Sequence, residues 1–597
     1  MSIVPLVKVT LYGRVAEKEA VLERLQIVGC LHLNDLRPAV GDDGAPPATA
    51  ADTREALQYL QDSPVQRRAP TQLVDVDVEK VVKDVIEIRK QTRELTEERA
   101  QLRKWIADIE PWGDFEFPEW ANKGALRFWF YALPNHKLDR LQRVTLPWRT
   151  VGRDHRFTYV VVVAADQPGG IPVAPTSVVP RSLSKLQARL QQVERELEEL
   201  DYRRIGLTLF SGAINDAVDE ADDRAARQRA ALGSLERDQL FALQGWAPQE
   251  RLAALRRFAE NAHLAMIIEQ PSLQDTPPTL LHNTPGLQGG EGLVTFYRTP
   301  GYQMWDPSKT VFFAFALFFA MIFSDAGYGL VLGGILLVTW KRLGRSREGR
   351  ALRDLILALV IFSIVYGVLV GTYFGVRPGA GSWLASLHAL DPTDQRMMIW
   401  IAIALGAAHL TLANLVTTWR RRRSLVALSA AGWACIIPGG FCLGLGKSHP
   451  GLAPLAGLGL VGLGLGGLLV LLFSSERPFS LAPKPLLFRL GDGLKGATGL
   501  TKAFGDVLSY LRLFALGLAS VKLAEAFNDL AGRSFASKGT WILLGLLVLI
   551  VGHGINFAMG IMSGVVHGLR LNAIEFFNWS LPEEGEHFRA FARKAEP

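Results

Sequence analysis

Two arginines most demand a chemical explanation, because both lie in apolar stretches of the C-terminal half. Arg512 lies in the run 504–519 with apolar residues on both sides, and Arg570 lies in the segment 541–577. An arginine at the centre of a membrane helix costs roughly 2.5–3.5 kcal/mol on insertion scales. A cost of that size indicates a functional role, and we expect it to involve ions.

A stripe of polar and small residues leads to Arg570. The stripe has spacings of 3, 4, 3, 4 and 3, which place its members on one face of a helix: His553, Asn556, Gly560, Ser563, His567 and Arg570. It extends about 25 Å at 1.5 Å per residue, which is most of a bilayer. The stripe is therefore a path for water or ions, or else a tight helix–helix seam.

Three further groups have structural as well as channel interpretations. Asp325 lies beside glycines in Ser324–Gly329 and can cap a helix, His553 can be a structural hydrogen-bonding group, and Asp506 precedes Arg512 in the same run.

Seven apolar segments make up the C-terminal half, at about 309–340, 355–376, 398–419, 424–446, 452–474, 504–531 and 541–577. Most reach the roughly 20 residues needed to cross a bilayer. The first is interrupted at Asp325, and we expect it to form two short helices or a re-entrant pair. The sequence therefore predicts an α-helical membrane domain with about eight transmembrane helices.

The distribution of basic residues supports this topology. If 309–340 turns back, the loops on the N-terminal domain's side, 341–353, 420–423 and 475–503, carry fifteen Lys and Arg residues. The opposite loops, 377–396, 447–451 and 532–540, carry five. Because basic loops stay inside, both the N-terminal domain and the C-terminus are expected to be cytoplasmic.

The first 300 residues have a different character. The N-terminus does not resemble a signal peptide, and residues 5–12, 16–28 and 30–35 read as strand, helix and strand before a linker at 38–50. Apolar residues at heptad spacing in 77–110 and 181–232 flank β-rich runs at 126–133 and 156–164. We predict an N-terminal cytoplasmic α+β domain with a long antiparallel coiled-coil arm that binds a partner.

Composition excludes several classes of protein. Residues 1–300 carry a net charge of −4 and residues 301–597 a net charge of +11, so the basic charge belongs to the apolar half and indicates membrane flanks rather than nucleic acid. Three cysteines form no disulfide framework or metal site. Gly440–Ser448 lacks the P-loop spacing, so we expect no catalytic site and no cofactor.

At these residues the chain resembles subunit a (subunit I) of the bacterial and archaeal V/A-type rotary ATPases. The most specific matches are Asp506–Ala519 and Val566–Phe577; weaker ones are Leu243–Pro248, Pro277–Asn283, Gly301–Pro307 and Phe323–Gly329. The resemblance implies a stator subunit with a cytoplasmic arm in 1–300 and an ion-translocation domain in 301–597. Its implied partners are peripheral stalk subunits, the central-stalk ring-cap subunit, a rotating proteolipid ring and membrane lipid, in a prokaryotic cell membrane.

The family's essential arginine maps onto Arg512, and its second arginine maps onto Arg570. Eukaryotic relatives have a glutamate where this chain has Gly560 and a histidine where it has Ser520. His567, Ser563 and Glu575 are the local candidates to replace that glutamate. The resemblance implies transport of protons or sodium ions through two half-channels, with ATP made or used elsewhere in the complex. The alternative is a secondary transporter or channel with a cytoplasmic coiled-coil domain.

Overall fold

The computed structural model describes residues 2–37, 48–67, 76–116, 126–171, 173–176, 178, 181–272, 274–379, 381–392, 394–475, 477, 483–536 and 541–594. It divides into two compact units, each assembled from separate stretches of sequence. The first contains Met1–Tyr12, Cys30–Asn34 and Gln244–Ala590, and the second contains Gly13–Gly29, Asp35–Leu243 and Phe591–Pro597.

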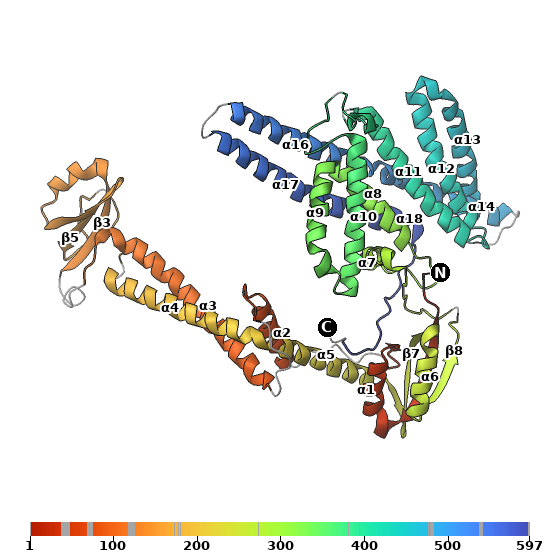
Figure 1. The fold of residues 1–597 in the computed structure, drawn as a ribbon, viewed down its shortest axis with the longest axis horizontal. Helices are drawn as coiled ribbons and strands as arrows, with labels where there is room; N and C mark the ends of the chain where they lie inside the picture. Colours follow the sequence, from red (N-terminus) through yellow and green to blue (C-terminus); the bar gives the residue numbers. More distant parts are fainter. Residues whose placement is uncertain are drawn as a thin grey trace. The chain divides into compact units, whose positions relative to one another are not determined.

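Two long helices form the arm of the second unit. Helix α3 (Val78–Ile109) and helix α4 (Leu183–Leu207) begin at Asp77 and Ser182, whose side chains accept hydrogen bonds from backbone N–H groups of the first turn. The helices lie side by side (Figure 1) and bury Leu102 and Val193 between them. Lys185, near the start of α4, pairs with Glu116 just after α3 ends, so the two helices are antiparallel. The predicted coiled-coil arm is confirmed.

A small sheet connects the two helices, and further helices pack beside their other ends. Strands β3 (Arg127–Pro134), β4 (Trp148–Arg153) and β5 (Phe157–Ala164) form an antiparallel sheet in the order β3-β5-β4. Helices α2 (Ala48–Gln61) and α5 (Ser211–Gly233) pack with the first turns of α3. The sequence did not predict α2, and the rest of the expected linker 38–50 lies outside the described residues.

Strands from distant parts of the chain meet in a second sheet, in the order β2-β7-β1-β8. They are β2 (His32–Asn34), β7 (Leu240–Pro248), β1 (Leu6–Arg14) and β8 (Ala265–Glu269), and β6 (Leu235–Arg237) pairs with β7. The connecting helices are α1 (Lys18–Val28) and α6 (Leu252–Asn261). The predicted strand, helix and strand in residues 5–35 correspond to β1, α1 and β2.

The rest of the first unit is helical. After α7 (Gln288–Tyr297), its main helices are α8 (Ser308–Phe323), α9 (Ala326–Leu343), α10 (Arg347–Val370), α11 (Gln395–Arg420), α12 (Ala427–Ser448), α13 (Ala453–Phe473), α14 (Pro483–Ala497), α15 (Gly499–Leu508), α16 (Leu511–Ala536) and α17 (Trp541–Arg570). A π-helical turn, Leu571–Phe576, and a short helix, α18 (Phe577–Ser580), follow α17.

Within the described residues, six helical stretches are long and apolar enough to cross a membrane, and α8 is a shorter apolar helix. The eight expected helices counted 309–340 as two short ones, and the six long stretches include neither of these two helices, α8 and α9. Helix α8 has only 16 residues, and α9 ends with Lys341 and Arg342. The break between them, at Ser324 and Asp325, is where the sequence predicted it.

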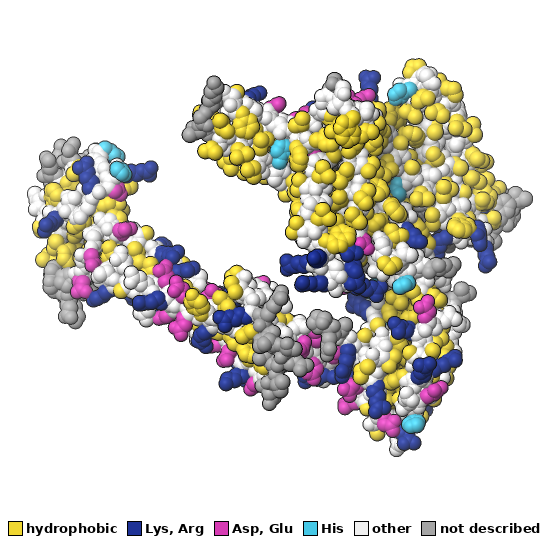
Figure 2. Space-filling model, in the orientation of Figure 1, with side chains coloured by type: hydrophobic (Ala, Val, Ile, Leu, Met, Phe, Trp, Pro, Cys, Tyr) yellow, Lys and Arg dark blue, Asp and Glu magenta, His cyan; other side chains and the backbone are white. Residues whose placement is uncertain are grey.

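Large apolar side chains cover the outer surfaces of these helices (Figure 2). Examples include Leu337 at 74% and Val338 at 86% exposed, on α9. In water such a surface would be strongly unfavourable, whereas in hydrocarbon it is not. The chain is a multi-pass membrane protein.

Candidate functional site

The backbone breaks two residues before Arg512. Helix α15 ends at Leu508 and α16 begins at Leu511, and the turn between them places Tyr510 entirely inside the protein. The Tyr510 hydroxyl forms a 2.7 Å hydrogen bond with Nδ1 of His409 on α11, whose ring stacks on Phe576. These contacts fix the start of α16 and therefore the position of Arg512.

Asp506 is held by a different contact. The indole N–H of Trp579 donates a 2.7 Å hydrogen bond to the Asp506 carboxylate. This joins the last turn of α15 to α18, so Asp506 has a structural role here.

A close contact with α8 sets the depth of α16. A Cβ atom at Gly517 would lie 2.4 Å from the backbone oxygen of Met321 and 2.6 Å from Oγ of Ser324. Only glycine permits this approach, because any larger residue would push the two helices apart. The backbone around Arg512 is therefore held on both sides, by the contacts of Tyr510 before it and by those of Gly517 after it.

Arg512 faces the π-helical turn that follows α17. Its Nη1 atom lies 4.0 Å from Oε1 of Glu575, whose side chain is 3% exposed, whereas that of Arg512 is 24% exposed. Among the described residues, neither Arg512 Nη1 nor Glu575 Oε2 has a hydrogen-bond partner. The two groups form a loose ion pair, and a buried hydrogen-bonding atom of each keeps no partner among the described residues.

His567 and Arg570 complete what we call the charge cluster: Arg512, His567, Arg570 and Glu575. The positive charges of Arg512 and Arg570 both act on His567 and on Glu575. His567 is half-buried and Arg570 is exposed. Among the described residues, His567 Nδ1 has no hydrogen-bond partner. The structure thus brings together four of the residues that the sequence singled out.

A second group, the polar network, joins α9, α16 and α17: Tyr328, Ser520, Asn528, His553 and Asn556. The Asn556 amide donates to the Tyr328 hydroxyl at 3.0 Å and to the Ser520 backbone oxygen at 2.9 Å. His553 forms hydrogen bonds of 2.7 Å with Tyr328 through Nδ1 and 3.0 Å with Asn528 through Nε2. The Ser520 hydroxyl also donates to the Asn556 side-chain oxygen at 3.3 Å.

Asp325 caps α9 and ties it to the turn after α10. Its carboxylate, 2% exposed, accepts hydrogen bonds from the backbone N–H groups of Tyr328, Phe374 and Gly375 at 3.1, 2.9 and 2.9 Å. Its role as a helix cap with three backbone hydrogen bonds therefore explains why Asp325 is buried.

The stripe on α17 has two different parts. Gly560 of the stripe and its neighbours Gly564 and Gly568 pack against four phenylalanines of α8, and a Cβ at Gly560 would lie 2.9 Å from the Phe323 ring. This part is a tight helix–helix seam, and the buried Asn556 continues its line. Ser563 and His567 are only half-buried, and Arg570 is exposed. A larger side chain at position 560 would therefore displace the Phe323 ring.

Tyr328 and Asn528 are the network members that the sequence analysis did not single out. Tyr328 lay within the quoted run Phe323–Gly329, and Asn528 lies eight residues after Ser520 on α16, so helical spacing could have suggested it. Within the described part of the chain, no group of three His, Cys, Asp or Glu side chains is placed to hold a metal ion.

Several known proteins are similar to this chain over most of its length. No protein-family model matches the chain. The V-type ATP synthase subunit I 1 of Treponema pallidum is 28% identical, covering 96% of this chain and 97% of its own length. The V-type ATP synthase subunit I of Chlamydia pneumoniae is 27% identical, covering 90% and 87%. The A-type ATP synthase subunit I of Pyrococcus horikoshii is 30% identical, covering 70% and 64%.

Among solved structures, one similar protein is the cytoplasmic N-terminal domain of subunit I, a homologue of V-ATPase subunit a. It is 16% identical, covers 44% of this chain and 99% of its own, and has a TM-score of 0.21. The resemblance seen in the sequence is confirmed by the curated relatives, which extend through both the arm and the membrane helices. Over most of its length, the chain is therefore a homologue of the subunit I proteins of V-type and A-type ATP synthases.

Proposed function

We propose that the chain is the membrane stator subunit of a V/A-type rotary ATPase and that Arg512 faces a carboxylate of a rotating proteolipid ring. The observation that carries the proposal is the loose pairing of Arg512. Its Nη1 atom lies 4.0 Å from Glu575 Oε1 and has no hydrogen-bond partner among the described residues, while the side chain as a whole remains 24% exposed. A guanidinium held in this way can engage a second carboxylate from outside the chain.

The charge of Arg512 gives the mechanism. A ring carboxylate must be neutral while it faces lipid and must release its ion at the stator. A guanidinium about 4 Å away favours the ionised carboxylate by on the order of 4 kcal/mol at an effective dielectric of 20. Arginine suits this role because it does not deprotonate in proteins. The same fixed charge repels cations, so ions cross only when the ring turns.

Two routes for ions lead to this arginine in the proposal. The charge cluster serves as the cytoplasmic half-channel, with Glu575 and His567 exchanging protons beside Arg512. The polar network serves the opposite half-channel, because Ser520 lies eight residues, or roughly 12 Å, farther along α16. Tyr328 and His553 can exchange a proton across the hydrogen bond that joins them, and Asn528 orients the His553 ring by accepting a hydrogen bond from it. A sodium ion would instead use the same oxygen atoms as ligands.

Glu575 takes the place of the glutamate that Gly560 cannot supply. It is the carboxylate that pairs with Arg512, and its burial excludes bulk water. Ser563 lies on the half-buried part of the α17 stripe and completes the proposed route towards His567 and Arg570.

The proposed partners follow from the two halves of the chain. In residues 301–597, α16 and α17 face the proteolipid ring, and membrane lipid covers the remaining helices. In residues 1–300, the arm binds peripheral stalk subunits, and the ring-cap subunit of the central stalk lies nearby. The complex lies in a prokaryotic cell membrane, and ATP chemistry occurs on other subunits.

Purification of the tagged full chain from its native membranes tests this function. We expect small proteolipid subunits and nucleotide-binding subunits to co-purify in stable amounts. Purification of the chain alone, with active solute uptake after reconstitution, would instead support a secondary transporter or channel.

A further inference from the structure

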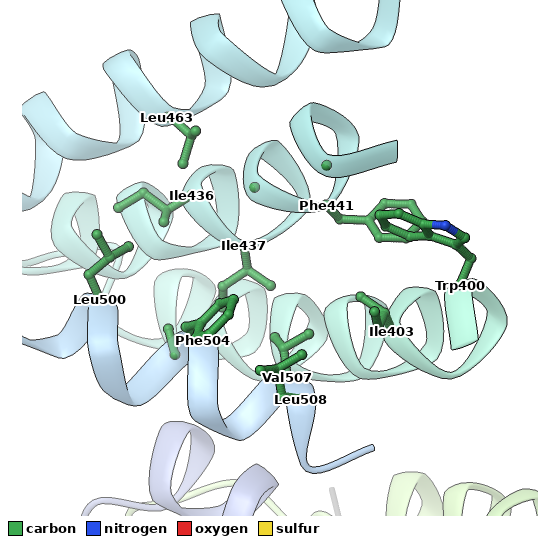
Figure 3. A pocket seen from close by; sticks show the side chains of 13 residues that line it. Trp400, Ile403, Ile436, Ile437, Phe441, Leu463, Leu500, Phe504, Val507 and Leu508 are labelled. Carbon is green, nitrogen blue, oxygen red and sulfur yellow. The ribbon is translucent and has the colours of Figure 1, made fainter. Parts of the chain in front are cut away.

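A pocket with a wholly apolar lining lies between four membrane helices, α11, α12, α13 and α15 (Figure 3). Its volume is about 240 Å³, and every lining residue is aliphatic, aromatic or glycine. The rings of Trp400 and Phe441 lie together at one end, with centroids 5.8 Å apart, and Leu500 lies towards the other end. Water is a poor occupant because it needs two to four polar partners.

The pocket opens on the surface of the membrane part. Two of its lining side chains, Leu500 and Phe504, are 54% and 66% exposed. Gly440 forms another part of the opening, because a Cβ atom there would meet nothing within 4 Å. All four helices lie within stretches that are apolar enough to span a membrane, so the opening faces hydrocarbon.

We propose that this pocket binds one acyl chain of a membrane phospholipid. An engineered cavity of about 150 Å³ is large enough to admit benzene, so 240 Å³ has room for a segment of acyl chain. The acyl chain supplies the dispersion contacts that the lining otherwise lacks. This site does not depend on the proposed ion transport.

A helix of a partner subunit does not fit this space. With its side chains an α-helix is about 10–12 Å wide, which is far more than the volume between α12 and α15 allows. A flexible hydrocarbon chain, by contrast, can follow an irregular channel between packed side chains. The occupant is therefore lipid rather than protein.

Photocrosslinking in membranes tests the proposal on the full chain. The probe is a phosphatidylcholine with a diazirine midway along one acyl chain, and mass spectrometry locates the adducts. In the unaltered chain we expect adducts on the peptides that contain Trp400 and Phe441. The variant Gly440→Leu should lower these adducts at least fivefold, because the new side chain fills the pocket.

Two further variants make the result specific. Val507→Phe fills the same pocket from α15 and should also lower the adducts at least fivefold. Gly464→Leu is the matched control, because Gly464 is exposed on α13 and a Cβ there meets nothing within 4 Å. It should leave the pocket adducts within twofold, and adducts around Leu465 should persist in both pocket-filling variants. The proposal would be overturned if the unaltered chain gave no adducts at Trp400 and Phe441. It would also be overturned if these adducts were equally abundant in the unaltered chain, in Gly440→Leu and in Val507→Phe.

Discussion

At the scale of single residues, the contact between Gly560 and Phe323 leaves no space for a larger side chain at position 560. A Cβ at Gly560 would come within 2.9 Å of the Phe323 ring, so a glutamate there would separate α17 from α8. Glu575 approaches Arg512 from the π-helical turn instead. Such turns are frequent at functional sites because they redirect side chains. In the proposed function, Glu575 is therefore the carboxylate that acts beside Arg512.

Replacement of Gly560 by alanine should weaken this packing. Overpacking in a tight seam costs about 1–3 kcal/mol, so we expect Gly560→Ala to lower the thermal unfolding midpoint of the detergent-purified chain. Gly554→Ala on the same helix is the control, because a Cβ there meets nothing within 4 Å. Equal midpoints for the two variants would show that the seam tolerates a methyl group.

At the scale of elements, α17 serves two purposes on neighbouring faces. Its glycine face packs on α8, whereas Ser563, His567 and Arg570 lie on a partly open face. The sequence pattern placed Gly560, Ser563, His567 and Arg570 on one stripe, and the structure separates Gly560 from the other three by burial.

This division predicts the pattern of thiol labelling along α17. With the native Cys30, Cys435 and Cys442 replaced by serine, Ser563→Cys and His567→Cys should react with a water-soluble thiol reagent. Asn556→Cys should react at least tenfold more slowly, because Asn556 is 2% exposed and the reaction requires a hydrated thiolate. Val565→Cys, in the α8 packing cluster, is a second slow control. Uniform labelling at all four positions would contradict the two-sided helix.

The arm contains an ion pair whose contribution depends on pH. Arg189 on α4 donates hydrogen bonds of 2.8 and 2.9 Å to the two carboxylate oxygens of Glu98 on α3, and these hydrogen bonds lower the pKa of Glu98. A lowered pKa in the folded state means that the stabilisation is present above the unfolded pKa, about 4.3, and is lost as pH falls through the folded pKa. Both side chains are 37% exposed, so the pair contributes only about 0.5 kcal/mol.

Hydrogen exchange measures this contribution. At pH 7, Glu98→Gln should reduce amide protection in both α3 and α4 by roughly twofold, and the difference should disappear near pH 3. Glu97→Gln is the control, because Glu97 pairs with Arg93 within α3 and should leave α4 unchanged. Equal protection of α4 in the unaltered chain and Glu98→Gln at pH 7 would show that the pair contributes nothing.

The sequence predicted those elements whose signal is local. The heptads of the arm, the break at Asp325 and the membrane arginines all follow from residue types and spacing. The break before Arg512 did not, because 504–531 reads as one apolar helix. It depends on Tyr510 meeting His409, 101 residues away. Likewise, the role of Gly560 depends on Phe323 of another helix, and single-helix periodicity carries no information about that contact.

At the scale of the whole chain, residues near its two ends meet in the first unit. The Thr279 N–H donates to the Glu586 oxygen at 2.7 Å, and the Phe588 N–H donates to Thr279 at 3.1 Å. Phe588 packs with Leu6 and Trp246. The Arg589 N–H donates to Nδ1 of His32, so this nitrogen must be unprotonated. The C-terminal segment thus closes onto the N-terminal strands.

This contact predicts release of the segment in acid. Burial lowers the pKa of His32, although the nearby Glu586 opposes the shift. The unfolded state therefore binds a proton more readily, and docking weakens as pH falls below about 6.5. Amide protection at Phe588 and Arg589 should fall between pH 7 and pH 5. In His32→Asn, which retains an acceptor but does not titrate, that fall should be absent. The same pH response in both proteins would exclude His32 as its cause.

Ion transport by the Arg512→Ala complex is the most direct test of the central claim. Vesicles that contain the assembled complex, energised with ATP, report transport as acidification or sodium uptake. The matched control is Lys522→Ala, because Lys522 lies on the same helix and pairs with Glu525 outside the charge cluster. We predict that transport by Arg512→Ala falls at least a hundredfold while the complex stays assembled and Lys522→Ala transports normally. Transport by Arg512→Ala at near the unaltered rate would contradict the proposed role of Arg512.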